Sequence, residues 1–353
     1  MSVLTLLRYM FASRPRHRHA PTSESETSFI DVHSHYLPPS YVAAMKSAGI
    51  HEMDGWPIPN WSPELAIETM DAYGIAAQVV SLTSPGVDFL QGTQAIHLAR
   101  TMNEYLAEMI QSYSPRFGGF AVLPLPDMPA ALEETRYALD DLALDGIGLF
   151  TNYNGIYLGD SFFDPVFAEL DRRGAVVFIH PTKPPNSESL KNTGVPTPIM
   201  EYPFETTRVA TNLVQNDVPS RFPNVRWIVT HGGGTAPYIF PRLMKAVGTE
   251  RVGQFRSLYY DLTATSTPGQ SALLCGMADP KRLLMGFDFP FMDVSTIRPV
   301  IAGLHLSDFS RSLINAIRAE TASSLFPQVL ARLRSVDGAG TQRGTGNNFP
   351  SGG

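Results

Sequence analysis

The chain has 353 residues, of which 43% are hydrophobic and 17% are charged, so it can bury a core of ordinary size. Its net charge of -6 gives no electrostatic basis for binding nucleic acid or anionic lipid. The single cysteine, Cys275, excludes an internal disulfide and a cysteine metal cluster. No apolar run approaches the roughly 18 residues of a membrane span. We therefore expect a cytoplasmic protein that binds neither nucleic acid nor membrane and whose histidines and carboxylates hold any metal.

The two ends of the chain differ in composition from its middle. Residues 1–28 contain four arginines and no acidic residue before Glu24, and we predict a flexible leader there. The same basic, acid-poor start resembles a mitochondrial transit peptide, which leaves the mitochondrion as the alternative compartment. Residues 336–353 are rich in glycine and predict a flexible, non-catalytic tail. The folded domain is expected over residues 29–335.

Between these ends, short apolar runs alternate with helical patterns. Ser62 before Pro63 predicts a helix start, because serine caps helices and proline fits their first turn, and Gly74 predicts its end. The predicted strands are 29–32, 75–82, 117–123, 146–150, 175–180, 226–230, 258–261 and 283–286. The predicted helices are 63–74, 93–113, 129–142, 165–173, 205–216, 236–247 and 270–277.

This alternation predicts the α/β class and, more narrowly, one (β/α)8 TIM barrel with a parallel sheet closed by surrounding helices. A doubly wound open sheet is the competing topology. No Gly-x-Gly-x-x-Gly motif follows the first strand, which disfavours the dinucleotide-binding version of that fold.

Four histidines and one aspartate mark the ends of predicted strands. His33 and His35 are two positions apart at the first strand, so their side chains point to the same side. His180 ends the fifth strand, His231 ends the sixth, and Asp288 follows the eighth. Active sites of barrels lie at the carboxyl ends of the strands. A lone histidine there is usually a packing residue, but this recurrence predicts a metal site, and such nitrogen and oxygen ligands suit Zn²⁺ or Mn²⁺.

Several segments resemble the amidohydrolase superfamily. They are Asp-Val-His-Ser-His at 31–35, the isolated His180, His231 with three following glycines, and Gly-Phe-Asp-Phe-Pro at 286–290. The resemblance is closest to the metal-dependent decarboxylases of that superfamily, which include the aminocarboxymuconate semialdehyde, γ-resorcylate and 6-methylsalicylate enzymes. The segments 55–64 and 149–153 are most similar to the 6-methylsalicylate group, and the similarity spans residues 29–327.

The resemblance implies roles for individual residues. The implied ligands of one divalent ion, Zn²⁺ or alternatively Mn²⁺, are His33, His35, His180 and Asp288. His231 is implied as a catalytic acid or base, together with Asp288, and Phe291 as a residue that packs on the substrate ring. Trp56 is a further candidate for the substrate pocket. Arg208 is a candidate to anchor a substrate carboxylate, although a salt bridge is the commoner role for such an arginine.

Two differences from these relatives narrow the expected number of metal ions and the expected substrate. The fourth strand ends in Phe150-Thr151-Asn152 without the lysine that bridges two metals in many members, which favours one ion. No arginine lies between Asp31 and Arg100, where the aminocarboxymuconate enzyme holds a substrate carboxylate. We therefore expect non-oxidative decarboxylation of a small aromatic carboxylate, with 6-methylsalicylate giving m-cresol and CO₂ as the leading reaction. The alternatives are a metal-dependent hydrolase of an ester, lactone or amide, and an inactive scaffold; a homodimer is left open.

Overall fold

The structure is a computed structural model that describes residues 28–341 except 186, 188–193, 266 and 293. The predicted leader over 1–28 and tail over 336–353 lie largely outside these described residues. The last helix, α15 (Pro327–Thr341), continues past the boundary predicted at residue 335. Among the described residues, no helix combines the length and apolar character needed to cross a bilayer.

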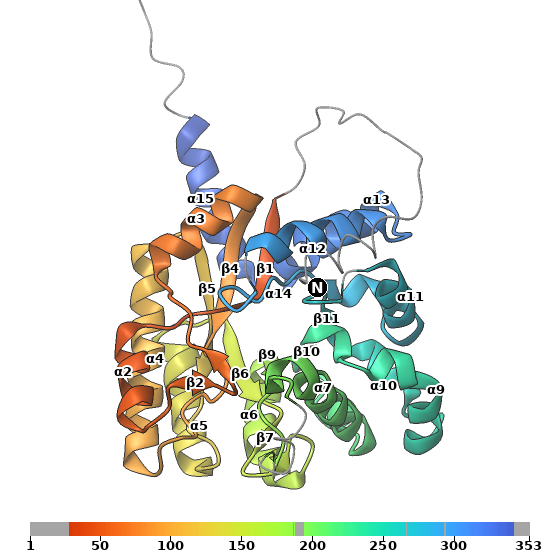
Figure 1. The fold of residues 1–353 in the computed structure, drawn as a ribbon, viewed down its shortest axis with the longest axis horizontal. Coiled ribbons are helices and arrows are strands. Elements are labelled where there is room, and N and C mark those ends of the chain that lie inside the picture. The colour runs from red at the N-terminus through yellow and green to blue at the C-terminus, as the bar shows by residue number, and fades with distance from the viewer. Residues whose placement is uncertain (1–27, 186, 188–193, 266, 293, 342–353) are drawn as a thin grey trace, which may run out of the picture.

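Eight parallel strands form one sheet whose helices lie around it (Figure 1). In sheet order they are β1 (Phe29–His35), β4 (Ile75–Ser81), β5 (Phe117–Val122), β6 (Gly146–Phe150), β9 (Val176–His180), β10 (Arg226–Val229), β11 (Tyr259–Asp261) and β12 (Leu283–Leu284). Parallel bridges from Asp31 to Met285 and from Ser34 to Phe289 join the first strand to the segment after the last one. This closure confirms the (β/α)8 barrel and excludes the open doubly wound sheet.

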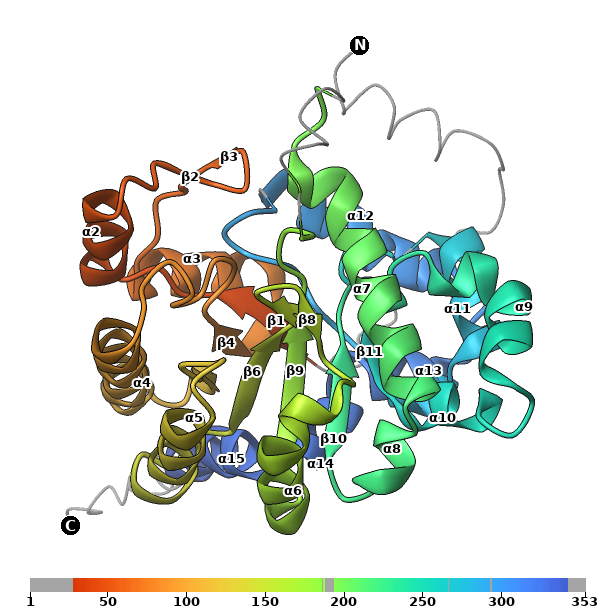
Figure 2. The same cartoon turned by 90° about the horizontal axis from the view of Figure 1, so that it is seen from below.

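The helices that follow the strands surround the barrel (Figure 2). They are α2 (Pro39–Ser47), α3 (Pro63–Tyr73), α4 (Thr93–Ser112), α5 (Met128–Arg136), α6 (Asp164–Arg173), α7 (Thr197–Gln215), α8 (Val218–Arg221), α9 (Ala236–Val247), α10 (Val252–Ser257), α11 (Pro268–Met277), α12 (Val294–Leu306), α13 (Arg311–Asn315) and α14 (Thr321–Leu325). The structure also contains two small antiparallel hairpins. One pairs β2 (Glu52–Met53) with β3 (Trp56–Pro57), and the other pairs β7 (Asn152–Tyr153) with β8 (Ile156–Tyr157).

Local signals correctly predicted how α3 begins and ends. The Ser62 hydroxyl accepts a hydrogen bond from the backbone N–H of Leu65, and Gly74 ends the helix with a φ of 69°. The start predicted for the helix at residue 205 was wrong, because α7 begins at Thr197 and contains Pro203 in its interior. Proline usually interrupts a helix, and the surrounding turns of α7 override that local preference. Strand β1 is also longer than predicted and includes both histidines of the His-Ser-His segment.

Side chains fill the barrel below the histidines. Phe178 of β9 stacks on Phe120 of β5 with ring centres 4.9 Å apart, and it meets the ring of His33 at 5.1 Å. Phe326, between α14 and α15, packs against Phe120 from the other side at 5.6 Å. An apolar layer therefore fills the barrel below the histidines, as expected for this fold.

Candidate metal centre

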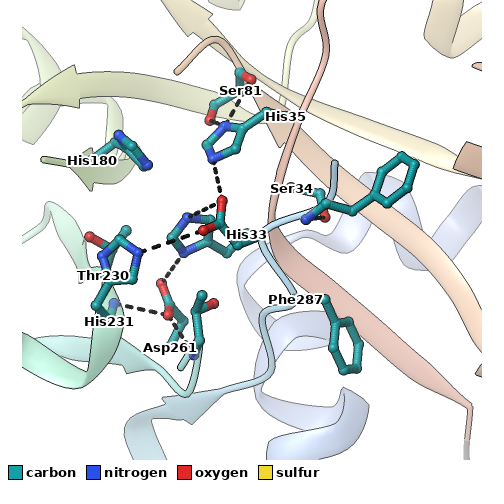
Figure 3. Close-up of polar contacts among 12 residues, drawn as sticks. His33, Ser34, His35, Ser81, His180, Thr230, His231, Asp261 and Phe287 are labelled. Carbon is teal, nitrogen blue, oxygen red and sulfur yellow. Dashed lines mark hydrogen bonds and ion pairs between the residues drawn. The ribbon is translucent and has the colours of Figure 1, made fainter. Parts of the chain in front are cut away.

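Four residues predicted as ligands converge at the mouth of the barrel. They are two histidines of β1, the last residue of β9 and the carboxylate that follows β12, namely His33, His35, His180 and Asp288. One ligand atom from each lies within 4.8 Å of the others. Nε2 of His35 and of His33 lie 3.0 and 3.6 Å from Oδ1 of Asp288. Figure 3 shows the labelled histidine rings gathered around this point.

The second ring nitrogen of each histidine is held by a neighbour. The Nδ1 contacts are His33 to Asp261 Oδ2 at 2.9 Å, His35 to the Ser81 hydroxyl at 3.1 Å, and His180 to the Pro181 carbonyl at 2.7 Å. A hydrogen bond at Nδ1 sets the tautomer that leaves a lone pair on Nε2. All three rings are thereby oriented to present Nε2 at the centre.

The residues present fit a divalent cation. Nε2 of His33 and Nε2 of His35 are buried and make no hydrogen bond within the protein. A buried polar atom without a partner costs free energy, and a metal ion removes that cost. Three imidazole nitrogens and one carboxylate oxygen form a donor set that Zn²⁺ and Mn²⁺ both accept. The four residues therefore form a site for one divalent metal ion.

Burial and neighbouring charges set the protonation of these groups. Burial lowers the pKa of His35 and of His180 and so favours the neutral imidazoles that bind metals. Burial also opposes a charge on His33, but the Asp261 carboxylate outweighs it and raises the pKa of His33. Burial alone would raise the pKa of Asp288, yet the neighbouring imidazoles of His231, His35 and His33 hold that pKa well below its ordinary value. The centre therefore combines an ionised Asp288 with the neutral imidazoles of His35 and His180, which are the forms that bind a cation.

His231 lies beside these four residues but is not one of the possible metal ligands. Its ring centre is 4.9 Å from that of His33, and its Nε2 is 4.0 Å from Oδ2 of Asp288. Its Nδ1 is buried and has no hydrogen-bond partner. Both His231 and Asp288 have positive φ values, 53° and 56°. Such backbone strain in residues other than glycine clusters at functional sites.

Asp261 is a residue of this centre that the sequence analysis did not single out. Its Oδ2 accepts from Nδ1 of His33, and its Oδ1 accepts from the backbone N–H of His231 at 3.0 Å (Figure 3). One carboxylate thus orients both histidines. The available signal was its position, because Asp261 ends the seventh barrel strand as the other site residues end theirs.

Asp31 supports the barrel from a different position. Its carboxylate accepts hydrogen bonds from the side chain of Gln78 on β4 at 3.0 Å and from the backbone N–H of Phe287 at 3.2 Å. Burial raises its pKa to about 7. These bonds hold β1 against both of its neighbours, so Asp31 helps to place the two histidines of that strand.

A cavity of about 350 Å³ opens onto the metal centre. His180, His231 and Asp288 line it, and so do Phe291 and Trp56. The ring of Phe291 meets that of His35 edge-on with centres 5.6 Å apart. No lysine or arginine lines this cavity among the residues that the structure describes.

The structure does not bring Arg208 to this cavity. The Arg208 guanidinium donates to Oε1 of the buried Glu205 at 2.6 Å and lines a separate groove beside Tyr157. Glu205 also accepts from the Tyr157 hydroxyl at 2.7 Å. Arg208 therefore occupies the salt bridge that was the alternative to substrate binding.

Comparison with known proteins identifies the family. The family model described as Amidohydrolase matches residues 30–328. The chain belongs to the amidohydrolase family. Among its relatives, the protein named Decarboxylase yanB from Aspergillus niger is 39% identical over 85% of this chain and 87% of its own length. The 6-methylsalicylic acid decarboxylase of Penicillium expansum is 35% identical over 85% of this chain and 96% of its own length.

Solved structures agree with the assignment of the chain to the amidohydrolase family. A crystal structure named Amidohydrorolase II is 29% identical, has a TM-score of 0.80 and covers 85% of this chain and 100% of that one. The 5-carboxyvanillate decarboxylase of Novosphingobium aromaticivorans, complexed with manganese, shares the fold at 21% identity with a TM-score of 0.74, over 87% of this chain and 100% of its own. The predicted resemblance is confirmed, and so is the predicted enzyme class, a decarboxylase of this family; hydrolysis is not favoured.

Proposed function

We propose that this amidohydrolase is a metal-dependent, non-oxidative decarboxylase of a hydroxybenzoate, with 6-methylsalicylate as the leading substrate. The observation that carries this proposal is the cavity: it has aromatic walls, it opens onto the metal centre through His180 and Asp288, and its described lining holds no lysine or arginine. A substrate with one carboxylate suits such a cavity. A second carboxylate would be buried without a counter-charge, which is costly.

His33, His35, His180 and Asp288 would hold the ion, with Zn²⁺ as the first choice and Mn²⁺ as the alternative. When bound, a divalent ion supplies Lewis-acid charge to carboxylate and phenolic oxygens at the mouth of the barrel. Phe291 and Trp56 offer aromatic surface to the substrate ring.

The reaction needs a proton at the ring carbon that carries the carboxylate. A C–H bond forms there, the C–C bond to the carboxylate then breaks, and CO₂ leaves as the ring regains its aromaticity. His231 and Asp288 both line the cavity, with Nε2 of His231 4.0 Å from Oδ2 of Asp288, so each is placed to deliver that proton to a bound substrate. A positioned acid of this kind contributes a factor of about 10² to 10⁴ in rate.

The test is product analysis with the metal-loaded protein on 6-methylsalicylate, salicylate and 2,6-dihydroxybenzoate, beside a panel of aryl esters and lactones. We expect m-cresol and CO₂ in equal amounts from 6-methylsalicylate, with metal content measured on the same sample. Turnover of an ester or lactone without release of CO₂ from any hydroxybenzoate would contradict the proposal.

A further inference from the structure

The β2–β3 hairpin forms one wall of the substrate cavity. Its two strands pair Met53 with Trp56, and both side chains line the cavity. Asp54 and Gly55 make the turn between them with positive φ values of 52° and 84°. An Asp-Gly turn of this kind suits a two-residue hairpin. The position of this turn therefore decides where the side chains of Met53 and Trp56 lie in the cavity.

The carboxylate at the tip of this hairpin joins two other segments. Oδ2 of Asp54 accepts a hydrogen bond from the hydroxyl of Tyr202 on α7 at 2.6 Å. It accepts a second from Oγ of Ser84, in the segment that follows β4, at 2.9 Å. Both Tyr202 and Ser84 line the same cavity. The hairpin is thus tied to the opposite side of the barrel mouth, where Figure 2 shows α7.

A third segment is connected through Ser84. Oγ of Ser84 lies 2.9 Å from Oγ1 of Thr182, two residues after His180. Because Ser84 donates its proton to Asp54, Thr182 donates to Ser84. The ring of Tyr202 also meets the ring of His180 edge-on at 5.7 Å. The Asp54 carboxylate is therefore linked to segments that lie next to the predicted metal ligand His180.

The hairpin depends on this attachment for its position. A single hairpin with two paired residues in each strand is not stable by itself in water. Hydrogen bonds to an ionised carboxylate are stronger than those between neutral groups, and Tyr202 is buried with only 7% of its surface exposed. The bonds at Asp54 are therefore polar contacts that hold the wall in place, in addition to the packing of the buried Met53 in the core.

We propose that Asp54 is a positioning residue that clamps the β2–β3 hairpin over the cavity and so sets the affinity for the substrate ring. Asp54 does not line the cavity, so it acts through Met53 and Trp56 and not on the reacting atoms. The effect on substrate affinity rests on the proposed decarboxylase function, whereas the clamp itself does not.

The first test measures the clamp without activity. In Asp54→Ala, hydrogen–deuterium exchange of the amides in residues 52–57 should accelerate about tenfold or more, because the hairpin loses its polar attachment. Metal content should stay that of the wild type. Glu52→Gln is the matched control, since it removes an exposed carboxyl from the same hairpin, and its exchange should not change. Unchanged exchange in Asp54→Ala would overturn the proposal.

The second test uses kinetics with 6-methylsalicylate. Asp54→Ala should raise KM about tenfold and lower kcat by less than about threefold, the pattern of lost binding shared by ground and transition states. Asp54→Ala/Tyr202→Phe should raise KM no more than Asp54→Ala alone, because both substitutions remove the same hydrogen bond between Asp54 and Tyr202. Independent effects that multiply would overturn the clamp. If the wild type decarboxylates no hydroxybenzoate, the proposed function fails, and the exchange result still decides the role of Asp54.

Ser84→Ala provides a milder variant in case Asp54→Ala does not fold. It removes one of the two bonds at Asp54 and the link to Thr182 while keeping the carboxylate. Exchange in residues 52–57 should rise by a smaller factor than in Asp54→Ala. No change in exchange for Ser84→Ala and Tyr202→Phe together would contradict the clamp.

Discussion

At the scale of single residues, the hydrogen bonding of Nδ1 distinguishes His231 from the three histidines that are proposed as metal ligands. Nδ1 of His33, His35 and His180 is held by a neighbouring oxygen, so these rings have one orientation. Nδ1 of His231 has no partner, although it is buried. Three imidazoles are thus prepared to bind a cation, and the fourth retains a nitrogen that can take or give a proton.

This difference predicts the outcome of His231→Ala. The variant should keep its metal, because the four proposed ligands are unchanged, and should lose turnover by a factor of about 10² to 10⁴ as a positioned acid or base is removed. Elemental analysis and initial rates on one preparation check both parts. His97→Ala, which changes an exposed histidine on α4, is the control for the loss of an imidazole. Turnover at the wild-type level would remove His231 from the mechanism.

Asp88 predicts a pH dependence of stability that is unrelated to the metal centre. Burial raises its pKa from 3.8 to about 7, and its Oδ1 is buried without a hydrogen-bond partner. Because the pKa is raised in the folded protein, the stability that this group contributes is complete below the ordinary value and is lost as the pH rises through about 7.

Asp88→Asn should therefore increase the free energy of unfolding more at pH 8 than at pH 5, since the amide never ionises. Urea unfolding at the two pH values measures this difference. Asp308→Asn, at an exposed position, is the control and should change stability equally at both. An equal effect of Asp88→Asn on the free energy of unfolding at the two pH values would contradict this prediction. It would show that ionisation of the Asp88 carboxyl does not destabilise the folded protein.

At the scale of elements, the three glycines after β10 determine where His231 lies. Gly232, Gly233 and Gly234 have φ values of 58°, 78° and 65°, a region that other residues rarely adopt. A Cβ on Gly234 would lie 2.0 Å from the carbonyl oxygen of Pro203 in α7. The absence of a side chain allows this segment to pack directly on α7, and that packing places His231 at the cavity.

Gly234→Ala should consequently destabilise the protein by about 2 kcal/mol or more, because it adds both backbone strain and a clash with backbone. Thermal and urea unfolding measure the loss. Gly276→Ala is the matched control on α11: a Cβ there meets nothing within 4 Å, and the change should stabilise by up to about 1 kcal/mol. Equal stabilities of the two variants would show that the segment can move away from Pro203.

At the scale of the whole molecule, the metal centre exists only when the barrel is closed. Its residues come from β1, from β9 and from the segment after β12, and the bridges between β1 and that last segment complete the ring of strands. Unfolding separates them, so an ion bound by all four stabilises only the folded state.

Removal of the metal should therefore lower the midpoint of thermal unfolding. An ion present at a thousand times its Kd stabilises by about 4 kcal/mol, and a chelator withdraws that contribution. Scanning calorimetry with and without chelator measures the shift. His180→Ala should contain no metal and should not respond to the chelator. Full metal occupancy in His180→Ala would contradict the proposed ligand set.

The sequence alone determined the barrel and the place of its polar residues. Strand and helix patterns are local, and the carboxyl ends of parallel strands share one edge, so His33, His180 and Asp288 could be predicted to meet. Local signals failed where tertiary contacts override them. Pro203 lies inside α7, although a proline predicts a break, and β1 extends through His35 because both neighbouring segments pair with it.

Only the tertiary structure decided which side chains serve the site. It brought Asp261 to His33 and His231, attached Asp54 to Tyr202, and held Arg208 against Glu205 away from the cavity. Each of these choices depends on a contact between side chains from different elements. Periodicity in the sequence reports which face of a strand or helix is buried, but it carries no information on which distant partner a polar side chain meets there.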